Sequence, residues 1–149
     1  MTTAGSGPGC VFCNHLAAGD DAAAHILYRA RDVFVLLNAF PYNTGHVMVA
    51  PVRHAGMLGE LTEEEQVELF RVATRATEII GEAMSPEGFN MGLNIGAAAG
   101  AGIPGHLHVH VVPRWAGDTN FMTTIGDAKV LPEMLAQTDA KLRPGFAAL

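Results

Sequence analysis

The 149-residue sequence predicts one α+β domain, built from a five-stranded antiparallel sheet, one long helix and a C-terminal helix. Short apolar segments rich in β-branched and aromatic residues lie between turn residues, which is typical of strands joined as hairpins. One segment of about two dozen residues instead repeats its apolar residues at helical spacing. Because no repeat, low-complexity tract or linker divides the chain, we expect a flexible tail over residues 1–9 and a single domain over residues 10–149.

Four strands are expected in the first two thirds of the chain. They share runs or alternation of apolar residues bounded by turns, and they span His25–Ala30, Asp32–Asn38, His46–Val52 and Phe89–Ile95. A turn over Pro41–Gly45 separates the second strand from the third. The fifth strand is expected at His106–Val112, after a glycine- and alanine-rich loop over residues 96–105.

The long helix should begin after Thr62, because Glu65 three residues later completes a capping box. The helix should end before Pro86. Its apolar positions recur at helical spacing, and they are Val67, Phe70, Ala73, Thr77, Ile80 and Met84. A closing helix is expected over Val130–Leu142, with Pro132 in its first turn, where a helix makes no use of the amide proton that proline lacks.

Composition limits the possible partners. With 49% hydrophobic and 16% charged residues, the chain has enough apolar material for a core and is not a disordered chain. Its net charge of −6 and its lack of a basic cluster argue against binding a nucleic-acid backbone. No apolar run approaches the ~20 residues of a membrane span, and Met1–Gly9 lacks the basic and apolar regions of a secretion signal. We therefore expect a cytoplasmic protein with no nucleic-acid or membrane partner.

The most informative motif is three histidines at two-residue spacing, His106, His108 and His110, separated by apolar residues. In an extended strand their side chains share one face, about 6.6 Å apart for neighbours and about 13 Å for the outer pair. The outer pair is too far apart to share one small ion easily, since zinc lies ~2.1 Å from an imidazole nitrogen, whereas neighbours could serve one reaction centre. Because imidazole exchanges protons near neutral pH, a functional site is favoured over a solvated strand face.

The only two cysteines, Cys10 and Cys13, have the spacing of a metal knuckle or a redox dithiol. A disulfide between them would close a very short loop and constrain the unfolded chain little. A thioredoxin-like pair would lie between a strand and a helix, whereas this pair follows the glycine-rich tail. The pattern therefore favours a metal site.

These motifs together resemble the histidine-triad (HIT) superfamily of nucleotide hydrolases and transferases. The segments that follow the order and spacing of that family are Cys10–Cys13, Phe34–Asn38, Pro41–His46, Pro51–His54, Gly92–Gly96 and His106–Trp115. Residues 113–122 resemble the bacterial branch related to diadenosine tetraphosphate phosphorylases. The resemblance implies an antiparallel α+β fold, a purine nucleotide or dinucleoside polyphosphate as substrate, and a homodimer whose sheets continue across the interface.

The resemblance also implies roles for three histidines. His108, the middle member, would attack the α-phosphorus and form a nucleotidyl-histidine, which water or inorganic phosphate then resolves. His110 would contact phosphate oxygens, and His46 would complete the polar cluster. Such a mechanism needs no catalytic metal, which agrees with the lack of a carboxylate cluster suited to magnesium.

Four further residues are candidate substrate contacts. Asn38 lies where the family commonly places an acidic residue that bonds the ribose hydroxyls. Asparagine can still donate and accept hydrogen bonds there, although it could also simply form a turn. Asn94 lies where the family contacts phosphate or ribose, and its alternative is a satisfied polar residue at the rim of the sheet. Gly102 belongs to a loop whose backbone amides can approach an anion. Trp115 could stack on a second nucleotide, or pack in the core or a dimer interface.

The sequences around the triad add two expectations. Many relatives carry a serine, threonine or glutamine just before the first triad histidine, whereas Ile103 and Pro104 offer no such side chain. We therefore do not expect a side-chain hydroxyl from this loop to activate the leaving group in this chain. Arg114 and Asn120 could contact a distal phosphate or a second nucleotide.

Cys10, Cys13, His54 and His106 match the positions of a structural zinc site in zinc-carrying members of the superfamily, and this ligand set suits zinc. The resemblance implies that the site would hold His106 in place and so aim His108 correctly. The alternative is a pair of reduced thiols with His54 on the surface.

Four functions are compatible with these residues. The leading one is an enzyme that transfers a nucleoside monophosphate from diadenosine tetraphosphate or a related dinucleotide, through His108, to phosphate or water. The same residues could hydrolyse nucleoside phosphoramidates or other AMP conjugates. The third is a non-catalytic purine nucleotide-binding protein, and the fourth is a metal-dependent hydrolase with His108 and His110 as metal ligands.

Overall fold

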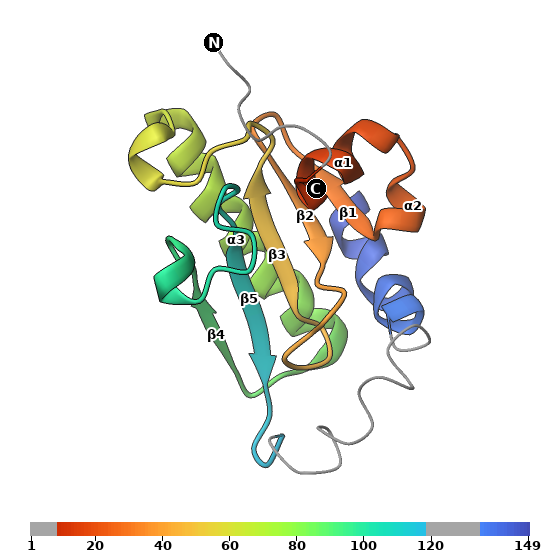
Figure 1. The fold of residues 1–149 in the computed structure, drawn as a ribbon. Coiled ribbons are helices and arrows are strands. Elements are labelled where there is room, and N and C mark those ends of the chain that lie inside the picture. The colour runs from red at the N-terminus through yellow and green to blue at the C-terminus, as the bar shows by residue number, and fades with distance from the viewer. Residues whose placement is uncertain (1–8, 119–134) are drawn as a thin grey trace.

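The computed structural model describes residues 9–118 and 135–149. Its centre is a five-stranded sheet with strand order β1-β2-β3-β5-β4, in which every neighbouring pair is antiparallel. The strands are β1 (Ile26–Arg29), β2 (Val33–Leu37), β3 (Val47–Pro51), β4 (Gly88–Gly92) and β5 (Val109–Arg114). The long helix α3 (Glu63–Met84) crosses one face of this sheet (Figure 1). The predicted fold class is confirmed.

Alternation along the strands divides the core into two layers, because successive side chains point to opposite faces of a sheet. In β2, Val33 and Val35 belong to the cluster formed with α3, whereas Phe34 and Leu36 pack on the opposite face. The same rule applies to the apolar residues that separate the three histidines. They pack toward α3, and they are Leu107, Val109 and Val111. The histidines are therefore left for the opposite face, which carries the candidate site.

Two short helices that the sequence did not predict cover this opposite face. They are α1 (Val11–Ala18) and α2 (Asp21–Ala24). The Sγ of Cys10 caps α1 by accepting a hydrogen bond of 3.4 Å from the amide of Cys13. Cysteine is not among the usual N-cap residues, so the sequence gives no clear start signal for this helix. The side chain of Phe12 is fully buried beneath it.

The last two strands have different boundaries from those predicted. β4 ends at Gly92, so Asn94 lies in the following loop, which contains the 3₁₀ turn η2 (Ala97–Ala99). β5 begins at Val109, so His106 and His108 lie just before the strand. This irregular stretch leaves the carbonyl of His106 free to bond a side chain instead of a neighbouring strand.

The capping box of Thr62 and Glu65 at the start of α3 is confirmed, after a 3₁₀ turn η1 (Leu58–Glu60). The predicted apolar positions of this helix are only partly right. Val67 is 65% exposed and Phe70 is 46% exposed. The buried positions are Glu65, Glu68, Leu69, Val72, Ala73, Ala76, Ile79 and Ile80.

Two buried glutamates explain why the buried face of α3 was misjudged. Glu65 accepts a hydrogen bond of 2.7 Å from the guanidinium of Arg53, and Glu68 accepts one from the backbone amide of Asp32. Because buried carboxylates are tolerated only with such partners, and these partners are distant in sequence, helical spacing alone could not identify this face.

The predicted closing helix over Val130–Leu142 is confirmed in its second half. Residues 135–147 are helical, so the helix runs past the predicted end. The predicted start of this helix lies outside the described residues. The predicted N-terminal tail, except Gly9, also lies outside them. Leu142 and Phe146 are fully buried in the cluster that includes α3. Among the described residues no helix is long and apolar enough to cross a membrane, and the cytoplasmic location stays a prediction.

Candidate functional site

His46, His108 and His110 form one cluster on the sheet face opposite α3. In the register of β3 and β5, Met48 pairs with His110, and His46, just before β3, lies beside the same ring. The ring centroids of His46 and His110 are 5.0 Å apart, and those of His108 and His110 are 4.8 Å apart. The structure thus brings together the three residues that the sequence proposed as catalytic.

One backbone hydrogen bond and one bond between the two rings determine which nitrogen of His46 and His110 carries the proton. The amide of Tyr42 donates to Nδ1 of His46 over 3.1 Å, so this Nδ1 holds no proton. The proton of the neutral His46 ring therefore lies on Nε2, which donates to Nδ1 of His110 over 2.9 Å. His110 in turn carries its proton on Nε2 and can donate it to a ligand.

His108 has the opposite tautomer. Its Nδ1 lies 2.9 Å from the carbonyl oxygen of His106, which can only accept a hydrogen bond. The proton is therefore on Nδ1, and Nε2 holds a lone pair. The site consequently places a nucleophilic nitrogen on His108 next to an N–H donor on His110.

Burial keeps these rings neutral. Desolvation, followed by repulsion from the neighbouring imidazoles His110 and His108, lowers the pKa of His46 to about 3. The same causes, burial and then His108, lower the pKa of His110 to about 4. Burial also lowers the pKa of His108, against the effect of its hydrogen bond to the His106 carbonyl. All three imidazoles are therefore neutral near pH 7, as the tautomer assignment requires.

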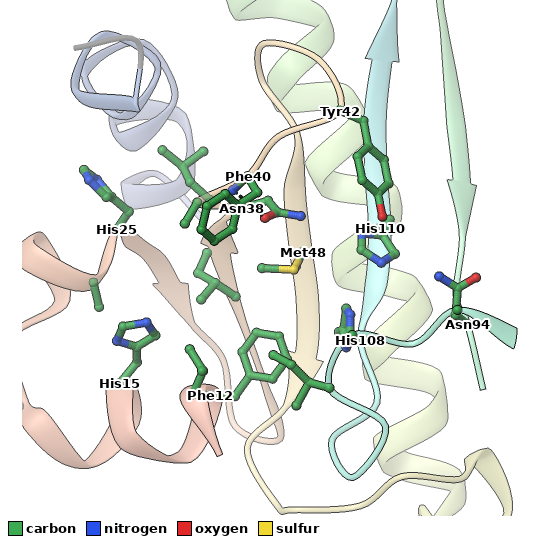
Figure 2. Close-up of a pocket in the computed structure, with 18 of the residues that line it drawn as sticks. Phe12, His15, His25, Asn38, Phe40, Tyr42, Met48, Asn94, His108 and His110 are labelled. Atoms are coloured by element: carbon green, nitrogen blue, oxygen red, sulfur yellow. Dashed lines mark hydrogen bonds between the residues drawn. The ribbon is translucent and has the colours of Figure 1, made fainter. Parts of the chain in front are cut away.

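A cavity of about 500 Å³ opens beside the cluster. Figure 2 shows His108, His110 and Asn94 on one side of it and His15 and His25 on the other. The wall between them is mostly apolar. None of the described residues that line it is a lysine, arginine, aspartate or glutamate. Any phosphate bound here must therefore be met by imidazole, amide and hydroxyl groups rather than by a lysine or an arginine.

Three of the four predicted substrate contacts line this cavity: Asn38, Asn94 and Gly102. The Oδ1 of Asn38 also accepts a hydrogen bond of 2.9 Å from the amide of Phe40, so this residue both shapes the turn and faces the cavity. Asn38 can therefore form the turn and contact a ligand at the same time.

Trp115 is not brought to the cavity. Because β5 runs on to Arg114, Trp115 lies beyond the far end of that strand, where its indole N–H donates to the carbonyl of Ser85 over 3.1 Å. Arg114 pairs with Asp118 and also donates to Asn90. The other predicted distal contact, Asn120, lies outside the described residues.

The sequence did not identify the cavity wall that α1 supplies. The ring of Phe12 packs against both His106 and His108, with centroid distances of 5.1 and 5.0 Å. Val11 and His15 line the cavity from the same helix. If Cys10 had been recognised as the N-cap of α1, the helical spacing of these residues could have indicated that they line one wall of the cavity.

His25 is a second unpredicted wall residue, and the C-terminal helix holds it. Its Nδ1 lies 2.8 Å from Oδ2 of Asp139, and Arg143 pairs with the same carboxylate at 2.7 and 2.8 Å. Arg143, and to a smaller extent His25, holds the pKa of Asp139 below its ordinary value. The backbone of His25 has a φ of 55°, and this left-handed conformation turns the chain from α2 into β1.

Cys10, Cys13, His54 and His106 form a cluster whose potential ligand atoms all lie within 4.8 Å of one another. Nδ1 of His106 is 3.4 Å from Sγ of Cys10 and 3.6 Å from Sγ of Cys13, and Nδ1 of His54 is 3.4 Å from Sγ of Cys13. Tetrahedral zinc, with bonds of ~2.3 Å to sulfur and ~2.1 Å to nitrogen, separates such ligands by about 3.6 Å. These three nitrogen–sulfur distances therefore match those of a tetrahedral metal site.

His106 is held in the tautomer that a metal requires. Its Nε2 lies 2.7 Å from the carbonyl oxygen of Pro51, so Nε2 carries the proton and Nδ1 directs its lone pair at the two sulfurs. Burial lowers the pKa of His106 to about 4, which keeps the ring neutral. These residues fit a metal ion by donor type, spacing and tautomer.

Comparison with known proteins identifies relatives over most of the chain. The family model of the HIT domain matches residues 20–117. An AP-4-A phosphorylase of Mycobacterium tuberculosis is 46% identical over 127 residues, which are 85% of this chain and 65% of that protein. The chain thus spans less than two thirds of the length of this relative. A bis(5'-nucleosyl)-tetraphosphatase (asymmetrical) of Schizosaccharomyces pombe is 33% identical over 95 residues, 64% of this chain and 52% of that protein.

Solved structures have the same fold. A Zn-bound histidine triad family protein from Mycobacterium smegmatis has a TM-score of 0.75 and 27% identity, covering 97% of this chain and 96% of that one. A hypothetical histidine triad nucleotide-binding protein from Sulfolobus tokodaii has a TM-score of 0.77 and 26% identity, covering 94% and 93%.

The lowered pKa values predict a loss of stability in mild acid. Between about pH 6.5 and 4 the unfolded chain binds protons at positions 46 and 110 that the folded chain excludes, so the unfolding free energy should fall as the pH falls. Each group should contribute about 1 kcal/mol per pH unit in this window. Urea unfolding at pH 7, 6, 5 and 4.5 measures the slope, and His110→Asn should reduce it. Unchanged stability down to pH 4.5 would contradict the assignment.

Proposed function

Because this chain belongs to the HIT family, we propose that it is an enzyme that cleaves dinucleoside polyphosphates at the α-phosphate through a covalent nucleotidyl-histidine on His108. The observation that carries the proposal is the pair of opposite tautomers, with a lone pair on Nε2 of His108 beside an N–H on His110. The names of the M. tuberculosis and S. pombe relatives support the substrate class.

In the first step Nε2 of His108 uses its lone pair to form a bond to the α-phosphorus. The bond from that phosphorus to the bridging oxygen breaks, and its electron pair leaves on the oxygen of the departing nucleotide. The imidazole becomes positively charged, because Nδ1 keeps its proton. The hydrogen bond from Nδ1 to the carbonyl of His106 stabilises that charge.

His110 stabilises the α-phosphate during this step. Its Nε2–H donates to a non-bridging phosphate oxygen. The hydrogen bonds from Tyr42 to His46 and from His46 to His110 hold the ring in the donating tautomer. In the second step an oxygen of inorganic phosphate attacks the phosphorus, the N–P bond breaks, and the electron pair returns to His108. Water does the same and releases one proton to solvent.

The nucleoside that stays attached to His108 lies in the cavity. The apolar wall accepts the base, Asn38 bonds the ribose hydroxyls, and Asn94 with the amide of Gly102 contacts phosphate or ribose. Mostly apolar walls with few polar groups would make the site tolerant of the base. The same nucleophile would also serve AMP conjugates with other leaving groups, including phosphoramidates.

The products of diadenosine tetraphosphate distinguish the acceptors. The purified protein is incubated with this substrate, with and without inorganic phosphate, and the products are separated by chromatography and identified by mass. ADP plus ATP that appear only with phosphate identify a phosphorylase, and AMP plus ATP in both cases identify a hydrolase. If neither pair forms, adenosine 5'-phosphoramidate is tested, and its cleavage would transfer the proposal to that substrate class.

His108→Ala separates an enzyme from a nucleotide-binding protein. We expect turnover to fall by about a thousandfold or more, whereas the affinity for a fluorescent AMP analogue should change only a few-fold. Full activity of the wild-type protein in excess chelator, while it remains folded, would exclude a metal-dependent hydrolase. An unaffected rate in the variant would remove His108 as the nucleophile.

We further propose that Cys10, Cys13, His54 and His106 bind a structural zinc ion. Their spacing and the tautomer of His106 support it, as does the Zn-bound protein from M. smegmatis. Bound zinc would hold the start of α1 and the backbone of His106, whose carbonyl orients His108.

Zinc removal should therefore lower stability. We expect about one zinc per chain in protein grown with ample metal, and a melting temperature several degrees lower after chelation. Cys13→Ser should lose the metal, whereas Asn14→Ser at the next position on α1 should retain it. Protein without stoichiometric zinc, or an unchanged melting temperature, would argue for the alternative of two reduced thiols.

The homodimer is proposed on two features. β4 is an edge strand, so one side of it has no neighbour within the described chain, and Met91 on it is 43% exposed. Val67 and Phe70 expose apolar surface on α3. Light scattering should give twice the mass of the chain, and Met91→Lys with Val67→Lys should give the monomer mass. A monomeric wild-type protein would overturn the proposal.

A further inference from the structure

None of the residues assigned in the proposed mechanism donates a hydrogen bond to the bridging oxygen of the departing nucleotide. Negative charge develops on the bridging oxygen as its bond to phosphorus breaks, and donors aimed at that charge accelerate the step. His110 is already assigned to a non-bridging oxygen. The described lining residues include no lysine or arginine, and they include one hydroxyl group, that of Tyr42.

Tyr42 lies against the catalytic histidines. Its ring stacks on His110 with a centroid distance of 5.6 Å and an interplanar angle of 27°, and its centroid is 4.7 Å from that of His46. Its backbone amide also bonds His46, so the network that orients the imidazoles fixes the residue at two points. Figure 2 shows the hydroxyl end of the ring directed toward His110 and the catalytic side of the cavity.

The phenol is available to a ligand. Tyr42 is 65% exposed, and its hydroxyl makes no hydrogen bond to any residue that the structure describes. A buried structural tyrosine would use its hydroxyl within the fold. Here the ring contacts His46 and His110, and its hydroxyl is left for a ligand at the edge of the site.

The position also suits the leaving group rather than the retained nucleotide. In an in-line displacement the bridging oxygen lies on the side of the phosphorus opposite Nε2 of His108. Tyr42 lies beyond His110 as seen from His108 (Figure 2), at the exposed side where a leaving nucleotide can extend. The nucleoside retained on His108 would occupy the other part of the cavity.

We propose that Tyr42 is a catalytic residue whose phenol donates a hydrogen bond to the bridging oxygen of the departing nucleotide. This inference rests on the proposed function. The phenol proton stays on Tyr42, because a phenol is a much weaker acid than the terminal phosphate that leaves. The bonds made and broken are therefore those of the first step, N–P and P–O, with no further proton transfer.

Two substrates test this role. A donor helps most when the leaving oxygen is basic, so diadenosine tetraphosphate, which releases ATP through its terminal phosphate, is compared with the 2,4-dinitrophenyl ester of AMP, whose two nitro groups make the released phenolate much less basic than that phosphate. In single-turnover experiments, Tyr42→Phe should slow nucleotidyl transfer from diadenosine tetraphosphate by about tenfold or more. Transfer from the ester should stay within about twofold, because phenylalanine keeps the stack on His110.

Tyr28→Phe is the matched control. Tyr28 is the other tyrosine of the chain, it packs against Phe146 with a centroid distance of 6.5 Å, and it does not line the cavity. This variant should transfer from both substrates at the wild-type rate.

The outcomes separate this inference from the proposed function. An equal loss with both substrates would mean that Tyr42 only positions His110, and no loss with either would mean that its hydroxyl is unused; both results overturn the inference alone. A wild-type protein that cleaves neither substrate would overturn the proposed function, and this inference with it.

Discussion

The carbonyl of His106 and the amide of Tyr42 decide where the protons lie on three imidazoles. A carbonyl only accepts hydrogen bonds and an amide only donates them, so neither ring that contacts them can reverse its tautomer without losing a bond. Burial also prevents the rings from taking up a second proton, because it makes the charged form of each ring unfavourable. One lone pair and one N–H donor at the cavity follow from these two contacts.

The fold supplies both contacts through the register of the central strands. Apolar residues between the histidines pack toward α3, which forces the imidazoles to the opposite face. The segment before β5 departs from regular pairing, and this exposes the His106 carbonyl to the ring of His108. The ring of His106 belongs to the Cys–His cluster at the start of α1, so the candidate metal site and the candidate catalytic site share one residue.

The strands, the capping box and the histidine triad could be predicted because each depends on residues close together in sequence. The strands show alternation of apolar residues, the capping box is Thr62 with Glu65, and the triad has two-residue spacing. The buried face of α3 could not, since Glu65 and Glu68 are buried by partners elsewhere in the chain. The cavity walls were missed for a similar reason: His15 comes from a helix with an unusual cap, and His25 is held by a carboxylate of the C-terminal helix.

The tautomers of the histidines are the most direct test, because every chemical step assigned to the site depends on them. Long-range ¹H–¹⁵N correlation spectra of the ligand-free protein at neutral pH distinguish a protonated Nδ1 from a protonated Nε2. They should show His108 protonated on Nδ1, and His46 and His110 protonated on Nε2. A His108 ring protonated on Nε2, or rings that exchange between the two tautomers, would contradict the mechanism.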